Sequence, residues 1–314
     1  MKNSLHTVLG ASGAVGQAVI NELSLRGLPL KAVSRTTNLP NVENKRADLL
    51  DPAQTRTAVQ GSSHVYLCVG LPYSAKVWKR GFPRIIKNVI AACDKEGAVL
   101  IFLDNAYMYG PLPLQNPIDE QHPQQPIAKK SHIRKEVADT LLQAIAEQRV
   151  QAVIGRAAEF YGPRAVNSMF YIRFLERMLQ GKVPQVLVKP GVKHTYAYTE
   201  DVGRALIALA LDVSTYGSVW HLPVGKPITI EEMVVMFNKV LGTDFKASFM
   251  PSLLRQGLGW LIPPIREVGE MLYQFETDYV FSFDKFQKQF PDFEATPYSE
   301  GIKKMVTSFQ QQLA

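Results

Sequence analysis

Residues Gly10–Val19, GASGAVGQAV, place three glycines at GxxGxxG spacing between a short apolar segment, LHTVLG, and an apolar helical pattern. Gly10 permits a tight turn, Gly13 lets a pyrophosphate approach the backbone, and Gly16 lets helix and strand pack closely. The start of a helix also supplies free N–H groups and a partial positive charge. Glycines mark simple turns as well, but in a βαβ setting we predict that this turn binds a dinucleotide.

Short apolar segments alternate with helical patterns through the first half of the chain, which is typical of βαβ units and a parallel sheet. Right-handed crossovers make such a sheet doubly wound. We therefore predict an α/β fold, a Rossmann-type doubly wound parallel sheet with a smaller, mainly helical C-terminal substrate lobe. The expected strands cover residues 5–10, 30–35, 64–70, 98–104, 150–156 and 218–223.

The 314 residues suffice for two linked lobes with a substantial core. We predict an NAD(P)-binding Rossmann domain over residues 1–163, completed by about 193–222. A substrate-binding lobe would comprise 164–192 and 223–314. Residues 111–126, PLPLQNPIDEQHPQQP, contain too many prolines for a helix or an inner strand. This long surface loop either borders a site or is a neutral excursion.

The composition is that of a soluble globular protein, with 46% hydrophobic and 20% charged residues. No apolar run reaches the roughly 18 to 20 residues of a membrane span, and no signal-peptide pattern opens the chain, so we expect a cytoplasmic protein without membrane contact. Cys68 and Cys93 lack metal-ligand spacing, and we expect buried thiols and no metal. The net charge of +7 suits an anionic small molecule better than nucleic acid, because basic and acidic residues are interspersed.

Arg35 closes the second expected strand, where the ribose of a bound adenosine would lie. An acidic residue there would bond a ribose 2′-hydroxyl, whereas arginine pairs with a 2′-phosphate, so we favour NADP and keep NAD as possible. The alternative is a solvated arginine at a strand end. Asp48 is placed to bond the adenine amino group, or else to cap the helix that begins near Pro52, for which Asp51 is better placed.

Together with YGP at 161–163 and HTYAYTEDVGRALIAL from His194, these residues resemble the extended short-chain dehydrogenase/reductase superfamily, which is NAD-dependent epimerase/dehydratase-like. The resemblance implies a Rossmann domain with a small substrate lobe, hydride transfer between a bound nicotinamide and a small-molecule substrate, and often a homodimer. It also implies cofactor contacts, which carry over to Gly10, Ser12, Gly13, Ala14, Val15, Gly16, Arg35, Asp48, Leu49, Gly70 and Ala158.

The superfamily's catalytic motif differs here. It places a tyrosine and a lysine four residues apart at the start of the helix after the long loop, and a serine or threonine at the end of the preceding strand. In this chain Lys130, Arg134 and Asn105 occupy those positions, so the chain resembles an atypical branch. Arg134 would supply charge and ribose hydrogen bonds without giving up a proton, and Lys130 is a candidate proton donor or base. The alternative is that both are solvated residues of a first helical turn.

Two nearby tyrosines, Tyr107 and Tyr109, are further candidate proton sources, with core or dimer packing as the alternative role. Glu159 falls where sugar-nucleotide enzymes of the superfamily commonly carry an asparagine. A carboxylate there would repel a diphosphate and argues against a nucleotide-sugar substrate, unless it pairs with Arg164. We predict an NADP-dependent oxidoreductase or epimerase-like enzyme for a small carbonyl or hydroxyl compound. The alternative is a catalytically silent NAD(P)-binding redox sensor or regulatory protein.

Overall fold

The computed structural model describes residues 4–36, 38–186, 189–249, 267 and 269–313. The chain divides into two compact units, each formed by segments that are separated in the sequence. The first unit comprises residues 1–108, 130–157 and 200–222. The second comprises residues 109–129, 158–199 and 223–314.

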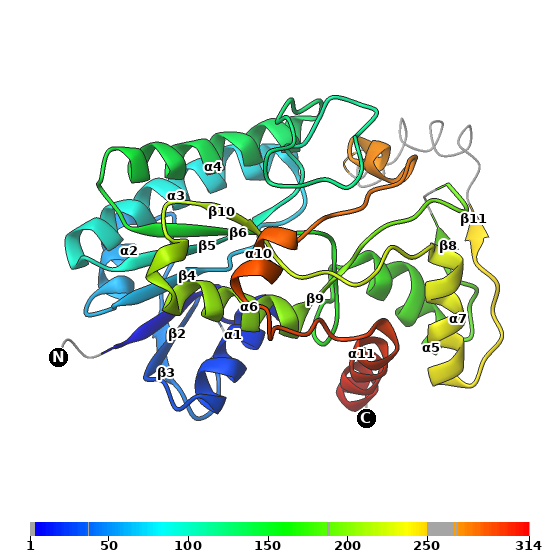
Figure 1. Cartoon of the computed structure of the whole chain (residues 1–314). Helices are drawn as coiled ribbons and strands as arrows, with labels where there is room; N and C mark the ends of the chain where they lie inside the picture. The colour runs from blue at the N-terminus through cyan, green and yellow to red at the C-terminus, as the bar shows by residue number, and fades with distance from the viewer. Residues whose placement is uncertain (1–3, 37, 187–188, 250–266, 268, 314) are drawn as a thin grey trace. The chain divides into compact units, whose positions relative to one another are not determined.

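The described part of the first unit contains a parallel sheet of seven strands in the order β10-β6-β5-β4-β1-β2-β3 (Figure 1). From β1 the chain continues outward through β2 to β3, and it then returns to place β4 on the other side of β1. This change of direction is the arrangement of a doubly wound sheet. The fold prediction is therefore confirmed. The strands are β1 (His6–Leu9), β2 (Leu30–Ser34), β3 (Glu43–Arg46), β4 (His64–Leu67), β5 (Val99–Asn105), β6 (Ala152–Ala157) and β10 (Val219–His221).

Central strands are apolar along most of their length because helices cover both faces of the sheet. Every residue of β1 and β6 is buried. The edge strand β3 has the sequence ENKR and is largely exposed. Its charged side chains protect an open edge against pairing with another strand.

Helices α2, α3 and α4 cover one face of the sheet and α1 and α6 the other (Figure 1). At Gly203 of α6 a Cβ atom would lie 2.8 Å from the backbone of Ala18 in α1, so these two helices approach closely. The helices are α1 (Ala14–Leu25), α2 (Pro52–Val59), α3 (Ala75–Glu96), α4 (Lys129–Ala146) and α6 (Thr199–Leu211). A short 3₁₀ turn, η2 (Val213–Thr215), precedes β10.

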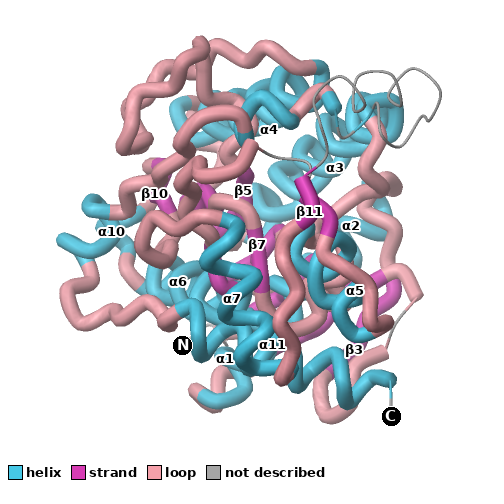
Figure 2. The backbone as a smooth tube through the Cα atoms, turned by 90° about the vertical axis from the view of Figure 1, so that its right-hand side faces the viewer, coloured by secondary structure: helices cyan, strands magenta, loops and turns pink. Residues whose placement is uncertain are grey.

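The second unit has an aromatic-rich core of its own, to which Phe170, Tyr196, Phe237 and Phe309 contribute. Helices α7 and α11 pack side by side in it (Figure 2). Residues 170–179 form a π-helical turn that continues into one α-helical turn. The elements are β7 (Phe160–Tyr161), η1 (Phe170–Leu175), α5 (Glu176–Leu179), β8 (Gln185–Val186), β9 (Ala197–Tyr198), α7 (Ile230–Leu241), β11 (Ser248–Phe249), η3 (Leu272–Phe275), α10 (Asp284–Gln289) and α11 (Tyr298–Leu313).

The proline-rich loop has no helix and no strand longer than an isolated bridge. Although the sequence analysis assigned it to the Rossmann domain, residues 109–129 belong to the second compact unit. Ile118 N–H donates to the carbonyl of Val280 at 2.7 Å, and the Asn116 amide donates to the carbonyl of Asp278 at 2.9 Å. Among the described helices, none has both the length and the apolar character needed to cross a membrane.

Candidate functional site

The glycine-rich turn after β1 is shaped by close backbone contacts that only glycine permits. Gly10 has φ +87°, and a Cβ atom there would lie 2.9 Å from the backbone of Cys68 and Val69. The N–H groups of Gly10 and Ala11 both donate to the carbonyl of Val33 at 3.0 Å. The turn is therefore held against the ends of the two neighbouring strands, β2 and β4.

The start of α1 is open to an anion. Gly13 precedes the helix with extended backbone, and no side chain caps the helix there. At Gly16 a Cβ atom would overlap the Gly10 carbonyl oxygen, so turn and helix are in direct backbone contact. The Gln17 amide fixes the turn by donating to the Ala11 carbonyl at 2.7 Å. Uncapped N–H groups beside a glycine cradle fit a pyrophosphate.

The other candidates around the turn differ in exposure. Ser12 and Gly13 are exposed and Ala14 is half-buried, whereas Val15 and Gly16 are buried. A contact of Val15 or Gly16 with a pyrophosphate would therefore use the backbone N–H group rather than a side chain.

Candidates for the adenosine end lie after β2 and β3. Arg35 directly follows β2 and is exposed. The Asp48 carboxylate accepts a hydrogen bond from Leu50 N–H at 3.0 Å, and Asp51, not Asp48, caps α2 through the N–H groups of Ala53 and Gln54. Asp48 is exposed and stays a candidate for the adenine.

Three more candidates for cofactor contacts, Leu49, Gly70 and Ala158, differ in burial. Leu49 is buried in the core, and its carbonyl accepts from the Asn88 amide at 2.8 Å. Gly70 is exposed in the loop after β4. Ala158 is buried and belongs to the second unit.

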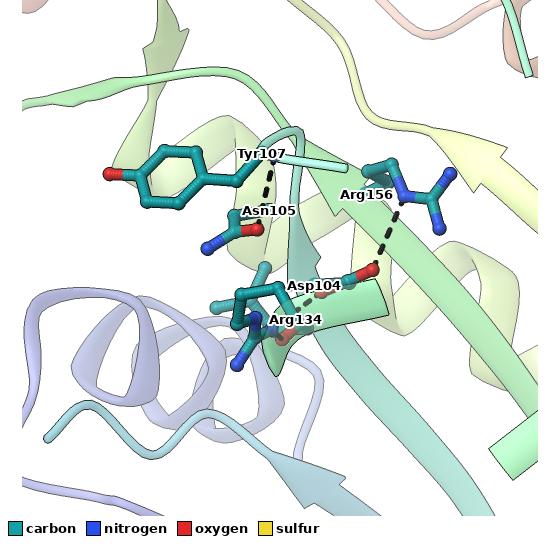
Figure 3. A network of polar contacts seen from close by, with 6 residues as sticks. Asp104, Asn105, Tyr107, Arg134 and Arg156 are labelled. Atoms are coloured by element: carbon teal, nitrogen blue, oxygen red, sulfur yellow. Dashed lines mark hydrogen bonds and ion pairs between the residues drawn. The ribbon is translucent and has the colours of Figure 1, made fainter. Parts of the chain in front are cut away.

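Arg134 lies in a buried ion-pair network at the end of β5 (Figure 3). One of its terminal guanidinium nitrogens lies 2.6 Å from Asp104 Oδ1, and Arg156 Nε lies 3.2 Å from Asp104 Oδ2. The guanidinium also lies over the rings of Phe82 and Phe102, at 4.7 and 5.3 Å from their centroids. Arg134 is only 4% exposed. This burial contradicts the solvated alternative, and the contacts favour a positioning role over a direct contact with a nicotinamide ribose.

Lys130 is fully buried, at 0% exposure, and its Nζ lies 4.6 Å from the centroid of the Tyr73 ring. The solvated alternative is therefore wrong for this residue too. Because Lys130 and Arg134 are four residues apart on α4, they share the face that packs into the first unit. Neither side chain is exposed to solvent. A pair that acts directly on a substrate would have to be accessible to it.

Asn105 ends β5, and its Oδ1 accepts a hydrogen bond from Tyr107 N–H at 3.3 Å. Figure 3 shows the Tyr107 phenol extending away from the Asp104 network. Tyr107 is half-buried, whereas Tyr109 is fully buried in the second unit, edge-on to His122 and Phe281. Tyr109 therefore has the core role that was its alternative.

Sequence reasoning missed two aromatic residues beside Lys130 and Tyr107. Tyr73 and Trp78 make an edge-to-face contact with centroids 5.3 Å apart, and Trp78 stacks on Tyr107 at 6.0 Å. Their only signal in the sequence is an aromatic pair in PYSAKVW, just beyond the strand that ends at Leu67. The buried indole N–H of Trp78 has no hydrogen-bond partner.

Glu159 lies in the second unit, where burial raises the pKa of its carboxyl group to about 8. Its Oε2 is buried and has no hydrogen-bond partner, so the pairing with Arg164 is absent at this atom. A carboxyl group with this pKa is mostly protonated at neutral pH. The sequence-based argument against a nucleotide-sugar substrate assumed a charged carboxylate at Glu159, so it does not hold for the protonated form.

Cysteine chemistry contributes little to this site. Cys68 and Cys93 are free and buried, and burial raises the pKa of Cys68 to about 12, which keeps it a thiol at neutral pH. Within the described ranges, no group of three or more His, Cys, Asp or Glu side chains is arranged to hold a metal ion.

Comparison with known proteins gives a family match and many similar folds. Residues 6–220 match the family described as "NAD dependent epimerase/dehydratase family". No curated protein matches the chain significantly.

Three similar solved structures cover nearly the whole chain. WbmH of Bordetella bronchiseptica, in complex with NAD+, has 18% identity and a TM-score of 0.77 over 99% of both chains. The UDP-glucuronic acid 4-epimerase of Bacillus cereus, in complex with NAD, has 15% identity and a TM-score of 0.80 over 99% of this chain and 100% of that one. The UDP-glucose 4-epimerase of Thermus thermophilus, also with NAD, has 20% identity and a TM-score of 0.78 over 98% and 99%. At these identities the likeness shows the fold alone.

Proposed function

Because the chain belongs to the NAD dependent epimerase/dehydratase family, we propose that it is an NADP-dependent oxidoreductase or epimerase-like enzyme. Its substrate would be a small carbonyl or hydroxyl compound. The observation that carries the proposal is the uncapped start of α1 beside a glycine cradle, where added side-chain atoms would meet the backbone. When bound, a nicotinamide dinucleotide would supply or accept the hydride.

The residues of the first unit have separate roles in this proposal. The Gly13 N–H donates to the Gly10 carbonyl at 3.0 Å within the turn. The backbone N–H groups of Ser12, Ala14, Val15 and Gly16 would therefore bind the pyrophosphate at the positive end of the α1 dipole, and Gly13 lets it approach the backbone. Asp48 and Leu49 flank the adenine, and Gly70 leaves room for the dinucleotide after β4.

Arg35 supports NADP as the cofactor. It is exposed at the end of β2, where its guanidinium can pair with a 2′-phosphate through two parallel hydrogen bonds. The three similar structures described above are named as complexes with NAD or NAD+, and NAD is therefore the competing cofactor.

Two of the similar structures are UDP-sugar 4-epimerases by name, which supports a sugar hydroxyl as one class of substrate. A mostly protonated Glu159 is compatible with a diphosphate, because a neutral carboxyl group donates a hydrogen bond instead of repelling negative charge.

The second candidate function is a catalytically silent NAD(P)-binding sensor or regulatory protein. The observation in its favour is the burial of Lys130 and Arg134, which occupy the positions of the superfamily's catalytic tyrosine and lysine. A protein that binds the dinucleotide and reduces no carbonyl compound would fit this alternative.

Calorimetric titration of the purified protein with NADPH and with NADH tests the proposal. We expect NADPH to bind more tightly, and Arg35→Leu to weaken NADPH binding about 10- to 100-fold, because a charged hydrogen-bond pair contributes about 1.5–3 kcal/mol. Arg26→Leu is the matched control, since Arg26 pairs with Glu22 near the far end of α1. Tighter binding of NADH would overturn the role of Arg35, and binding of neither would overturn the proposed function.

A further inference from the structure

Four side chains meet in the first unit, and we call them the Tyr73 cluster: Tyr73, Trp78, Tyr107 and Lys130. Tyr73 lies in the loop after β4, and Tyr107 follows β5. Trp78 and Lys130 lie near the starts of α3 and α4. In open parallel sheets, ligands bind outside the carboxyl ends of the strands. The Tyr73 cluster therefore lies at the carboxyl ends of the strands, where the proposed dinucleotide would bind.

The cluster is arranged with its cation inside and its hydroxyl groups outside. Lys130 is fully buried, with Nζ 4.6 Å from the Tyr73 ring centroid, whereas Tyr73 is 40% exposed. The Tyr73 hydroxyl donates to the Tyr107 hydroxyl over 3.5 Å. Trp78 packs edge-to-face with Tyr73 and stacks on Tyr107, which holds the two phenol rings in a fixed relation.

This arrangement favours negative charge on the Tyr73 oxygen. An ammonium group over an aromatic ring is attracted to its π face, and it also stabilises the phenolate that forms when the hydroxyl loses its proton. The burial of Lys130 strengthens this interaction, because solvent screens buried charges less than exposed ones.

We propose that Tyr73 is the catalytic acid–base residue of this protein and that Lys130 is the positioning residue that stabilises its phenolate. The inference rests on the proposed function. In the direction of reduction, a bound reduced nicotinamide dinucleotide would supply the hydride to the substrate carbonyl carbon and would itself be oxidised. The Tyr73 O–H bond breaks and its proton goes to the carbonyl oxygen, giving the alcohol. Solvent then returns a proton to the Tyr73 phenolate.

The other candidate proton donors fit less well. Lys130 is without exposed surface, and Tyr109 is fully buried in the second unit. Tyr107 is half-buried, whereas Tyr73 is 40% exposed and has the Lys130 ammonium group over its ring. Tyr107 therefore acts as the hydrogen-bonding partner of Tyr73.

The test combines turnover with cofactor binding. NADPH oxidation is followed with benzaldehyde, cyclohexanone and phenanthrenequinone as carbonyl probes, and NADPH affinity is measured by calorimetry. We expect Tyr73→Phe to lower kcat roughly 100- to 10,000-fold, the usual contribution of general acid catalysis, with NADPH affinity within about twofold of wild type. The fall of the rate at high pH, where Tyr73 would be deprotonated, should disappear in this variant.

Variants of Lys130 separate its charge from its packing. Lys130→Met should lower kcat with the NADPH affinity unchanged, and Lys130→Arg, which keeps the charge, should restore part of kcat. Tyr216→Phe is the matched control, because Tyr216 precedes β10 at the opposite, amino-terminal end of the sheet and its hydroxyl donates to the Ala210 carbonyl.

Three results would overturn the inference. Tyr73→Phe with a kcat within threefold of wild type would exclude Tyr73 as the acid. A wild type that binds NADPH and reduces none of the probes would overturn the catalytic role while leaving the dinucleotide site intact. A wild type that binds no dinucleotide would overturn the proposed function itself, and the inference with it.

Discussion

Replacing Asp104 by asparagine tests the buried network that holds the start of α4 to the end of β5. The Asp104 carboxylate accepts from Arg134 at 2.6 Å and from Arg156 at 3.2 Å, and the exposure of all three side chains is 5% or less. Two unit charges about 4 Å apart attract by about 4 kcal/mol at an effective dielectric constant of about 20. Removing one partner of a buried ion pair costs about 3–5 kcal/mol, because the remaining charge stays buried and uncompensated. We therefore expect Asp104→Asn to lower the free energy of unfolding by about 3–5 kcal/mol.

Urea unfolding followed by far-ultraviolet circular dichroism measures this loss. Asp139→Asn is the matched control, because Asp139 forms an exposed pair with Lys135 on the same helix at 2.7 Å. An exposed pair of this kind contributes about 0.3–0.5 kcal/mol. A loss below about 1 kcal/mol for Asp104→Asn would refute the argument that the carboxylate compensates two buried guanidinium groups.

Two further predictions concern the first strand and the turn that follows it. Burial, and then the nearby His64, lower the pKa of His6 from 6.5 to about 4, so the unfolded chain binds the proton first as the pH falls. The contribution of His6 to stability should be lost between pH 6.5 and 4, by up to about 3 kcal/mol, and His6→Gln should remove this part of the decline, as pH-dependent urea unfolding would show. Burial also lowers the pKa of His194 to about 4, and the decline that His194 causes should remain in His6→Gln. Gly10→Ala should abolish NADPH binding in calorimetry and lower stability more than Gly61→Ala, because both glycines have positive φ but only Gly10 has backbone within 4 Å of the added Cβ. Equal effects of the two glycine variants would contradict the close-contact argument.

The sequence predicted the features that depend on local patterns. The glycine turn, the alternation of apolar strands with helices, and the Asp51 cap of α2 all depend on residues close together in the chain. Backbone conformation, capping and strand patterning act within a few residues, so one sequence is enough to detect them. The same holds for the proline-rich loop, whose lack of regular structure follows from its composition.

Only the tertiary structure decided how the charged residues at the start of α4 are used. From the sequence, Arg134 is either solvated or a cofactor contact. In the fold it joins Asp104, 30 residues before it, and Arg156, 22 residues after it, in one buried network. The buried Nζ of Lys130 lies over the ring of Tyr73, which belongs to the loop after another strand, and the Tyr73–Tyr107 hydrogen bond spans 34 residues. A charged side chain on a helix becomes a surface group or a buried one according to what packs against that face. Those neighbours come from distant strands, and no local pattern in the sequence specifies them.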